Sequence, residues 1–165
     1  LCQRKMSLTD VLKNWIVSEL SQPDKSVNGN ALCPFAKNAW FANKVKVREE
    51  KDDLWDAVYE EIQRFDDTYQ VVICASYTHK QSYDDLEASC FALNGWLATT
   101  GHNVWLLAFK EKKLSMVFIQ RLTDIDNASA KLEALGYYSN YEDQDYQRLV
   151  KHRRDRRKCY EETNA

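Results

Sequence analysis

Apolar residues recur every three or four positions in several parts of the chain, which is the pattern of amphipathic helices. Between residues 8 and 20 they fall on one helical face, and Ser7 is placed to cap this helix with Asp10 three residues later. Pro34 is suited to the first turn of a second helix, and Gly101 is suited to end a later one. The predicted helices span residues 8–20, 34–43, 54–65, 82–99, 126–135 and 143–158.

Four other segments are typical of β-strands. Lys44–Arg48 alternates apolar and charged residues, as a half-exposed strand does. Val71–Ala75 is a continuous apolar run, which is expected of a central strand covered on both faces. Val104–Lys110 and Leu114–Leu122 are rich in β-forming residues and are separated by only three charged residues. These last two segments therefore predict a hairpin.

The order of these elements gives two strand–helix–strand crossovers followed by the hairpin. The sequence therefore predicts an α/β fold, or an α+β fold, with a small mixed sheet of about four strands and helices packed on it. The 165 residues are enough for one domain with its own core. We expect this domain at residues 7–140, with a polar, basic C-terminal helix or tail at 141–165. Residues 1–6 are interpreted as a non-native or flexible N-terminal remnant.

Composition excludes several classes of protein. A net charge of −2 gives no overall field that would attract nucleic acid or an anionic membrane. The longest apolar runs, such as Val104–Phe109, are far too short to cross a bilayer. The five cysteines form no Cys-x-x-Cys pair, so neither a zinc framework nor a disulfide scaffold is indicated. We expect a cytoplasmic protein without a cofactor or a membrane partner.

Cys33 is the first candidate for chemistry. If Pro34 begins a helix, Cys33 lies at its N-cap, beside free backbone N–H groups and the positive end of the helix dipole. That position lowers the pKa of a thiol, and Lys37 lies one turn further on. The alternative is a cysteine that fills space beside Trp40, which is how most free cysteines behave. Both interpretations stay open at this point.

Cys33-Pro34-Phe35 resembles, at low similarity, the active-site turn of glutaredoxin- and thioredoxin-type proteins. The second cysteine of that turn would fall at Ala36, so a monothiol role is predicted in place of a dithiol one. Ala31–Lys37 is more similar to a bacterial family of uncharacterised proteins that carries Gly-Leu-Cys-Pro-Phe-Ala near the N-terminus. In that family a basic strand, an acidic helix and an apolar strand ending near a histidine follow the motif. The resemblance implies a family but no reaction.

Several other residues are candidates because of where the predicted elements end. His79 follows the predicted central strand, where open α/β sheets usually bind ligands, and it is a candidate general base. Asp124 and Asp126 follow the last strand and are the only candidates for a Mg²⁺ site, although capping of the next helix by Asp126 explains them better. Arg121 is a candidate anion-binding residue at the same strand end. We expect no metal site.

The C-terminal segment 148–158 contains seven basic residues and one acid. Arg153 and Arg154 are candidate binding residues within it. The tail could contact nucleic acid phosphates, but neutralising the acidic body of the protein is the better explanation. The predicted function is a thiol-dependent or redox site at Cys33. The alternative is a non-enzymatic binding or assembly module that uses its aromatic surface and basic tail with a protein, a nucleic acid or a second copy of itself.

Overall fold

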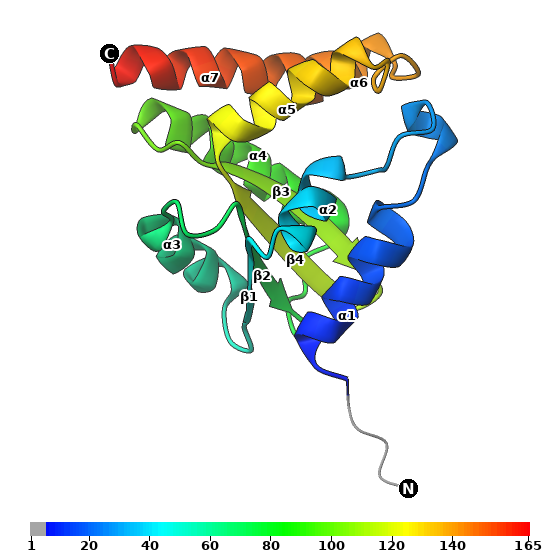
Figure 1. Cartoon of the computed structure of the whole chain (residues 1–165). Helices are drawn as coiled ribbons and strands as arrows, with labels where there is room; N and C mark the ends of the chain where they lie inside the picture. The colour runs from blue at the N-terminus through cyan, green and yellow to red at the C-terminus, as the bar shows by residue number, and fades with distance from the viewer. Residues whose placement is uncertain (1–5) are drawn as a thin grey trace, which may run out of the picture.

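The computed structural model describes residues 6–165 and contains a four-stranded mixed sheet in the order β1-β2-β4-β3 (Figure 1). The α/β class expected from the sequence is confirmed. Residues 1–6 were interpreted from the sequence as an N-terminal remnant. Residues 1–5 of this segment lie outside the described part of the chain. The strands are β1 (Val45–Glu49), β2 (Val71–Ser76), β3 (Trp105–Glu111) and β4 (Leu114–Gln120).

The sheet contains both predicted crossovers and the hairpin. β1 and β2 are parallel, and Val47 pairs with Ile73 in their shared register. β4 is antiparallel to β2 and to β3, so β3 points in the same direction as β2 with β4 between them. The crossover from β2 to β3 therefore leaves one strand position empty between them. β4, the second strand of the hairpin, occupies that position. This arrangement makes β1 and β3 the edges of the sheet.

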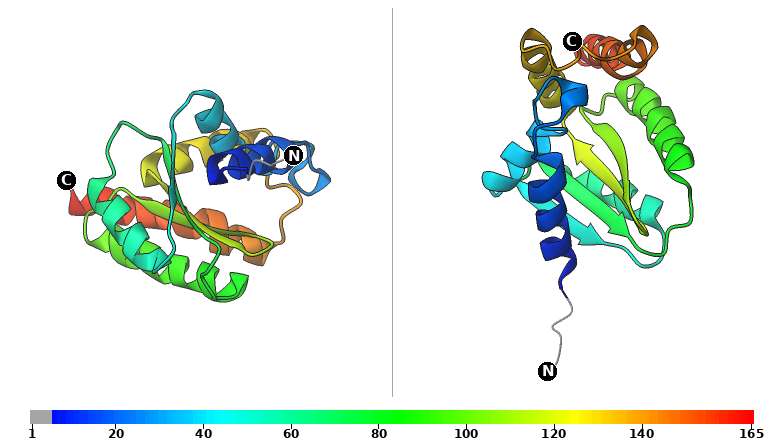
Figure 2. Two further views of the ribbon diagram at one scale, coloured as in Figure 1. Left: turned by 90° about the horizontal axis from the view of Figure 1, so that it is seen from below. Right: turned by 90° about the vertical axis from the view of Figure 1, so that its right-hand side faces the viewer.

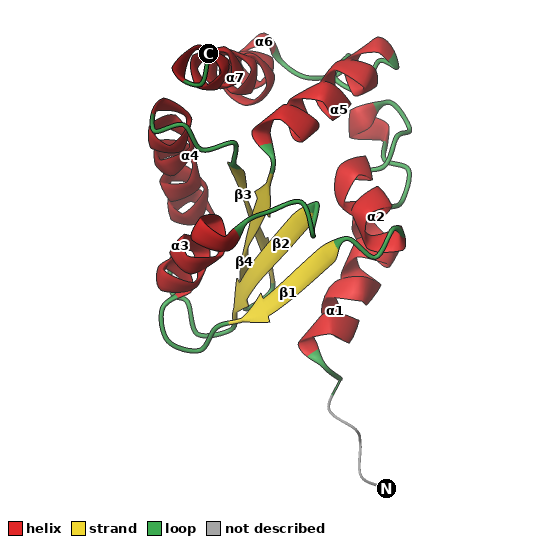
Figure 3. Ribbon diagram, turned by 60° about the vertical axis from the view of Figure 1, so that its left-hand side comes forward, coloured by secondary structure: helices red, strands yellow, loops and turns green. Residues whose placement is uncertain are grey.

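Helices cover both faces of the sheet (Figure 3). α3 and α4 pack against the face that presents Val72, Val117 and Leu106, while α1 and α2 pack against the face that presents Ile73 and Phe118. In the described residues every helix is too short or too polar to cross a lipid bilayer. The helical segments on the two faces are α1 (Leu8–Trp15), η1 (Ile16–Leu20), η2 (Lys25–Val27), α2 (Pro34–Phe41), α3 (Leu54–Arg64) and α4 (Tyr83–Thr99).

The C-terminal helices lie across one end of these layers (Figures 1 and 2). His152 stacks on Phe91 of α4 with ring centroids 4.4 Å apart, and Arg157 pairs with Asp126 of α5 at 3.3 Å. The segment predicted as a helix or tail is therefore a helix docked on the domain. Its elements, with the helix that precedes them, are α5 (Leu122–Ala134), α6 (Asp143–Tyr146), η3 (Gln147–Lys151) and α7 (His152–Thr163).

The helical path through α6 and α7 contains one turn of π-helix at η3. A π turn accommodates one residue more than an α turn, and such turns are frequent at functional sites. The helix α1 also ends in a π turn at η1, where Ser21 N–H donates to the Ile16 carbonyl at 2.9 Å. The sequence predicted helices in both places, but not their wider turns.

The start of α5 differs from the prediction. The helix begins at Leu122, and Asp126 lies in its second turn, so the expected cap at Asp126 is wrong. The side-chain oxygen of Asn103, from the loop before β3, accepts the Thr123 N–H at 3.0 Å. A residue distant in sequence thus provides the acceptor that a local cap would supply.

Asn94 of α4 joins this helix to the outer edge of the sheet. Its side-chain amide donates to the Leu106 carbonyl at 2.9 Å, and its side-chain oxygen accepts the Leu106 N–H at 2.7 Å. Both residues are almost completely buried. The side chain therefore occupies a place on β3 that another strand would otherwise take, and it leaves neither polar group of Leu106 without a partner.

Replacing Asn94 by Leu is expected to lower the free energy of unfolding by on the order of 3 kcal/mol, because the N–H and the carbonyl of Leu106 lose their partners in a dry interior. Asn38→Leu, the same change at an exposed position of α2, is the control. Equilibrium denaturation in urea measures both. Equal stability of the two variants would contradict the assigned role of Asn94.

Candidate functional site: an aromatic cavity with a buried arginine

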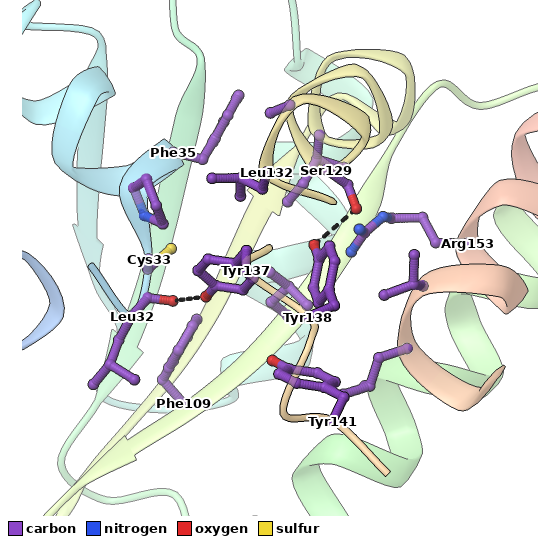
Figure 4. Close-up of a pocket in the computed structure, with 16 residues that line it drawn as sticks. Leu32, Cys33, Phe35, Phe109, Ser129, Leu132, Tyr137, Tyr138, Tyr141 and Arg153 are labelled. Carbon is purple, nitrogen blue, oxygen red and sulfur yellow. Dashed lines mark hydrogen bonds between the residues drawn. The ribbon is translucent and has the colours of Figure 1, made fainter. Parts of the chain in front are cut away.

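A cavity of about 170 Å³ lies between the start of α2, strand β3, helix α5 and the C-terminal helices (Figure 4). Leu107 and Phe109 of β3 and the tyrosines that follow α5 line it, and Phe109 also packs edge-on against Trp15 of α1 with ring centroids 5.7 Å apart. The sixteen residues that line it are Leu32, Cys33, Pro34, Phe35, Leu107, Phe109, Ile125, Ala128, Ser129, Leu132, Tyr137, Tyr138, Tyr141, Leu149, Val150 and Arg153.

Cys33 is at the N-cap of α2 and Pro34 is the first helical residue, as the sequence predicted. The thiol lines the cavity. Burial raises the pKa of the Cys33 thiol, and the backbone N–H of Ala36 opposes only part of that effect. The expected lowering of this pKa is therefore wrong, because removal from water outweighs the helix N-terminus. Lys37 lies further along α2 and does not line the cavity.

Arg153 is at the opposite side of the cavity and is unusual for its lack of partners. Its residue is only 7% exposed, and the structure of residues 6–165 contains no ion pair or hydrogen bond from its guanidinium group. The Nε atom is buried without any acceptor. Figure 4 shows the guanidinium pointing towards Ser129 and Tyr138. A buried cation without a counter-ion is costly, so it marks a place where a negative charge is missing.

Two hydroxyl groups lie beside this cation. The hydroxyls of Ser129 and Tyr138 are 2.7 Å apart and share one hydrogen bond. Each hydroxyl carries one proton, so their mutual bond uses one of the two and leaves the other available to a ligand. The guanidinium and this hydroxyl pair together form a set of donors without a complementary acceptor.

Local structure explains how the tyrosines reach the cavity. Gly136, at φ 76°, ends α5 with a left-handed turn that reverses the chain. Tyr137 then turns back, and its hydroxyl donates to the Leu32 carbonyl beside Cys33. Tyr138 packs edge-on against the Tyr141 ring at 5.2 Å. The loop thereby connects the Cys33 side of the cavity with the Arg153 side.

The π turn at η3 places the remaining residues of this wall. Leu149 and Val150 of η3 and Arg153 of α7 all line the cavity. His152, beside Arg153 in sequence, packs instead between Phe91 and Trp105 on the other side of the helix. Packing of this neighbouring side chain fixes the rotation of the helix and hence the direction of Arg153.

The structure does not bring His79 or Arg121, the other candidates at strand ends, to Cys33. The His79 ring nitrogen bonds to the side chain of Gln81 at 2.8 Å, and its ring lies beside Trp55, which packs on the α3–α4 face. Cys33 packs with the helices of the other face. The sheet separates the two residues.

Arg121 and the two aspartates have structural partners. Arg121 bonds to Asp124 at 2.7 Å and to the carbonyl of Asp66 at 2.8 Å, which ties α5 to the loop after α3. Asp126 faces α7 and pairs with Arg157. Each of the two candidate Mg²⁺ ligands is thus paired with an arginine. Residues 6–165 contain no group of three or more potential metal ligands close together.

Most of the basic tail is paired with acidic side chains. Arg154 binds Glu133 of α5 at 2.9 Å, and Arg148 approaches Glu87 of α4 at 3.4 Å. In the described part of the chain, four of the seven basic residues form such pairs: Arg148, Arg154, Arg157 and Lys158. This arrangement favours neutralisation of the acidic body over a free surface for nucleic acid.

Sequence reasoning selected Cys33 and Arg153 but did not place them in one site, and it missed Ser129 and Tyr138. The available signal was the cluster of tyrosines directly after Gly136. Comparison with known proteins yielded no matching family model, no matching curated relative and no matching solved structure. The resemblance to the bacterial family of uncharacterised proteins therefore stays a prediction.

Because burial raises the pKa of Cys33, its alkylation by iodoacetamide is expected to be slow at pH 7 and to accelerate up to and beyond pH 9. A raised pKa keeps the thiolate fraction small until the pH approaches that value. Peptide mass spectrometry measures the rate at Cys33 specifically, with glutathione as the unperturbed comparison. A rate that reaches its plateau below pH 8 would show the opposite shift.

Proposed function

We propose that this protein binds a small organic anion in the cavity, with the guanidinium of Arg153 as its counter-ion. The proposal makes the chain a ligand-binding protein, which is a form of the non-enzymatic binding module expected as the alternative from the sequence. The observation that carries it is a cation that is 7% exposed, lines a cavity and has no acidic partner among residues 6–165.

Three other arginines of the chain support this proposal by contrast. Arg121, Arg154 and Arg157 are all more exposed to water than Arg153, yet each has a carboxylate within 3.3 Å. A cation that only stabilised the fold would be expected to have such a partner, because an uncompensated buried charge destabilises a protein strongly. Arg153 instead has apolar and aromatic neighbours and a spare hydroxyl donor. Preorganised donors of this kind favour binding because the protein does not have to rearrange.

Thiol-dependent chemistry at Cys33 is the second candidate function. It is favoured by one observation, that the thiol lines the same cavity as Arg153, so a bound ligand would lie beside it. Cys33→Ser distinguishes the two candidates. If the thiol is only part of the wall, this variant binds the anion as the wild type does. A covalent adduct between a bound ligand and Cys33, detected by mass spectrometry of the intact protein, would support the thiol reaction.

Arg153→Met is expected to abolish stabilisation by ligand while leaving the free energy of unfolding of the unliganded protein unchanged or about 1 kcal/mol higher, because the variant removes an unpaired buried charge. Arg154→Met, which removes the neighbouring surface-paired cation, is the control and keeps the ligand response. Thermal denaturation with a panel of acetate, isovalerate, benzoate, methanesulfonate and phenyl phosphate measures the effect.

Two results of the ligand panel would contradict this proposal. One is that none of these anions stabilises the wild type at millimolar concentration. The other is that Arg153→Met and the wild type respond equally to every anion that does bind. A marked loss of stability in the unliganded Arg153→Met protein would also count against it, since that result would give the cation a structural role.

A further inference from the structure

We propose that the ligand is an aromatic monocarboxylate about the size of benzoate, with its carboxylate at Arg153 and its ring between the tyrosines and Phe109. This inference rests on the proposed function, because it specifies which anion the cavity accepts. It follows from the charge, the size and the walls of the cavity.

The charges of the lining residues limit the charge of the ligand. Among the sixteen lining residues, all of which are described, Arg153 is the only lysine or arginine, and none is an aspartate or a glutamate. One cation balances a single negative charge, whereas a phosphate monoester carries nearly two at neutral pH. An amino acid would bring an ammonium group that finds no carboxylate here. The site therefore favours a monoanion without a positive charge.

The donor geometry favours a carboxylate among the monoanions. A guanidinium group is planar and presents paired N–H donors that match the two oxygens of a carboxylate. The free proton of the Ser129–Tyr138 hydroxyl pair supplies a further donor beside them. A carboxylate has lone pairs enough to accept all of these bonds at once. Its oxygens would supply the acceptor that the buried Nε atom of Arg153 lacks.

The volume and the walls favour an aromatic ring as the rest of the ligand. The cavity measures about 170 Å³, and an apolar protein cavity of about 150 Å³ accommodates benzene. The rings of Tyr137 and Tyr138 meet edge to face with centroids 4.8 Å apart, and Tyr138 and Tyr141 do so at 5.2 Å. Such rings stabilise a further ring through edge-to-face contacts in addition to its burial. Phe109 and Leu107 of β3 complete an apolar floor.

Isothermal titration calorimetry with a set of related compounds tests this inference on the full chain. Benzoate is compared with benzamide, which is neutral, phenyl phosphate, which is a dianion, phenylalanine, which is a zwitterion, and acetate, which has no ring. Biphenyl-4-carboxylate tests the size limit. We expect benzoate to bind at least tenfold more tightly than each of the others. Arg153→Gln should reduce benzoate affinity to that of benzamide, and Arg154→Gln should not change it.

The outcomes separate this inference from the proposed function. If acetate, phenyl phosphate or the biphenyl compound binds as tightly as benzoate and still requires Arg153, the assigned ligand class is wrong and the anion-binding function stands. If no compound binds, or if binding is the same in Arg153→Gln, both are overturned. Should Arg153→Gln fail to fold, the order of affinities in the wild type decides the ligand class by itself. Nuclear Overhauser contacts between ligand ring protons and tyrosine rings place the ligand in the cavity, and their absence contradicts the assignment.

Discussion

The two hydrogen bonds between the Asn94 side chain and the backbone of Leu106 hold α4 against the edge of the sheet, and the C-terminal half of the cavity depends on them. α7 packs on α4 through the stacked rings of His152 and Phe91. Because Arg153 follows His152 directly, the position of α4 on β3 sets the position of the buried cation. A single amide side chain thus connects the edge of the sheet with the site at the end of the molecule.

The cavity combines apolar walls, which stabilise the fold, with a buried unpaired charge, which destabilises it. Its walls are apolar and aromatic, which stabilises the fold through burial, while Arg153 places an unpaired charge among them and costs free energy. Arg153 has no acidic partner in the described residues, whereas the half-buried Arg121 and Arg157 pair with carboxylates. The proposed function explains this cost, because a bound anion would give the guanidinium of Arg153 the partner that it lacks.

The fold could be predicted from the sequence because its determinants are local. Ser7 caps its helix as the sequence indicated, and the apolar run beginning at Val71 forms a fully buried strand. The site could be predicted only in part, because its determinants are distant in sequence. The helix start at Cys33 followed from Pro34, but the pKa of its thiol depends on burial by segments that include Tyr137, about one hundred residues later. Likewise, Arg153 was one cation among seven in the tail, and its burial in the folded protein distinguishes it from the others.

The π turn at Gln147–Lys151 changes the direction in which the side chains of α7 point. A continuous α-helix of the same length would point them elsewhere. Each residue of an α-helix advances the side-chain direction by roughly 100°, and a π turn takes up about one residue more than an α turn. With α-helical geometry throughout, the residues after this turn would face a direction rotated by roughly that angle relative to α6. The π turn therefore determines which side chains of α7 face the cavity. Without the π turn, the same length of chain would turn Arg153 away from the cavity, and the walls would keep their aromatic rings but lose their charge.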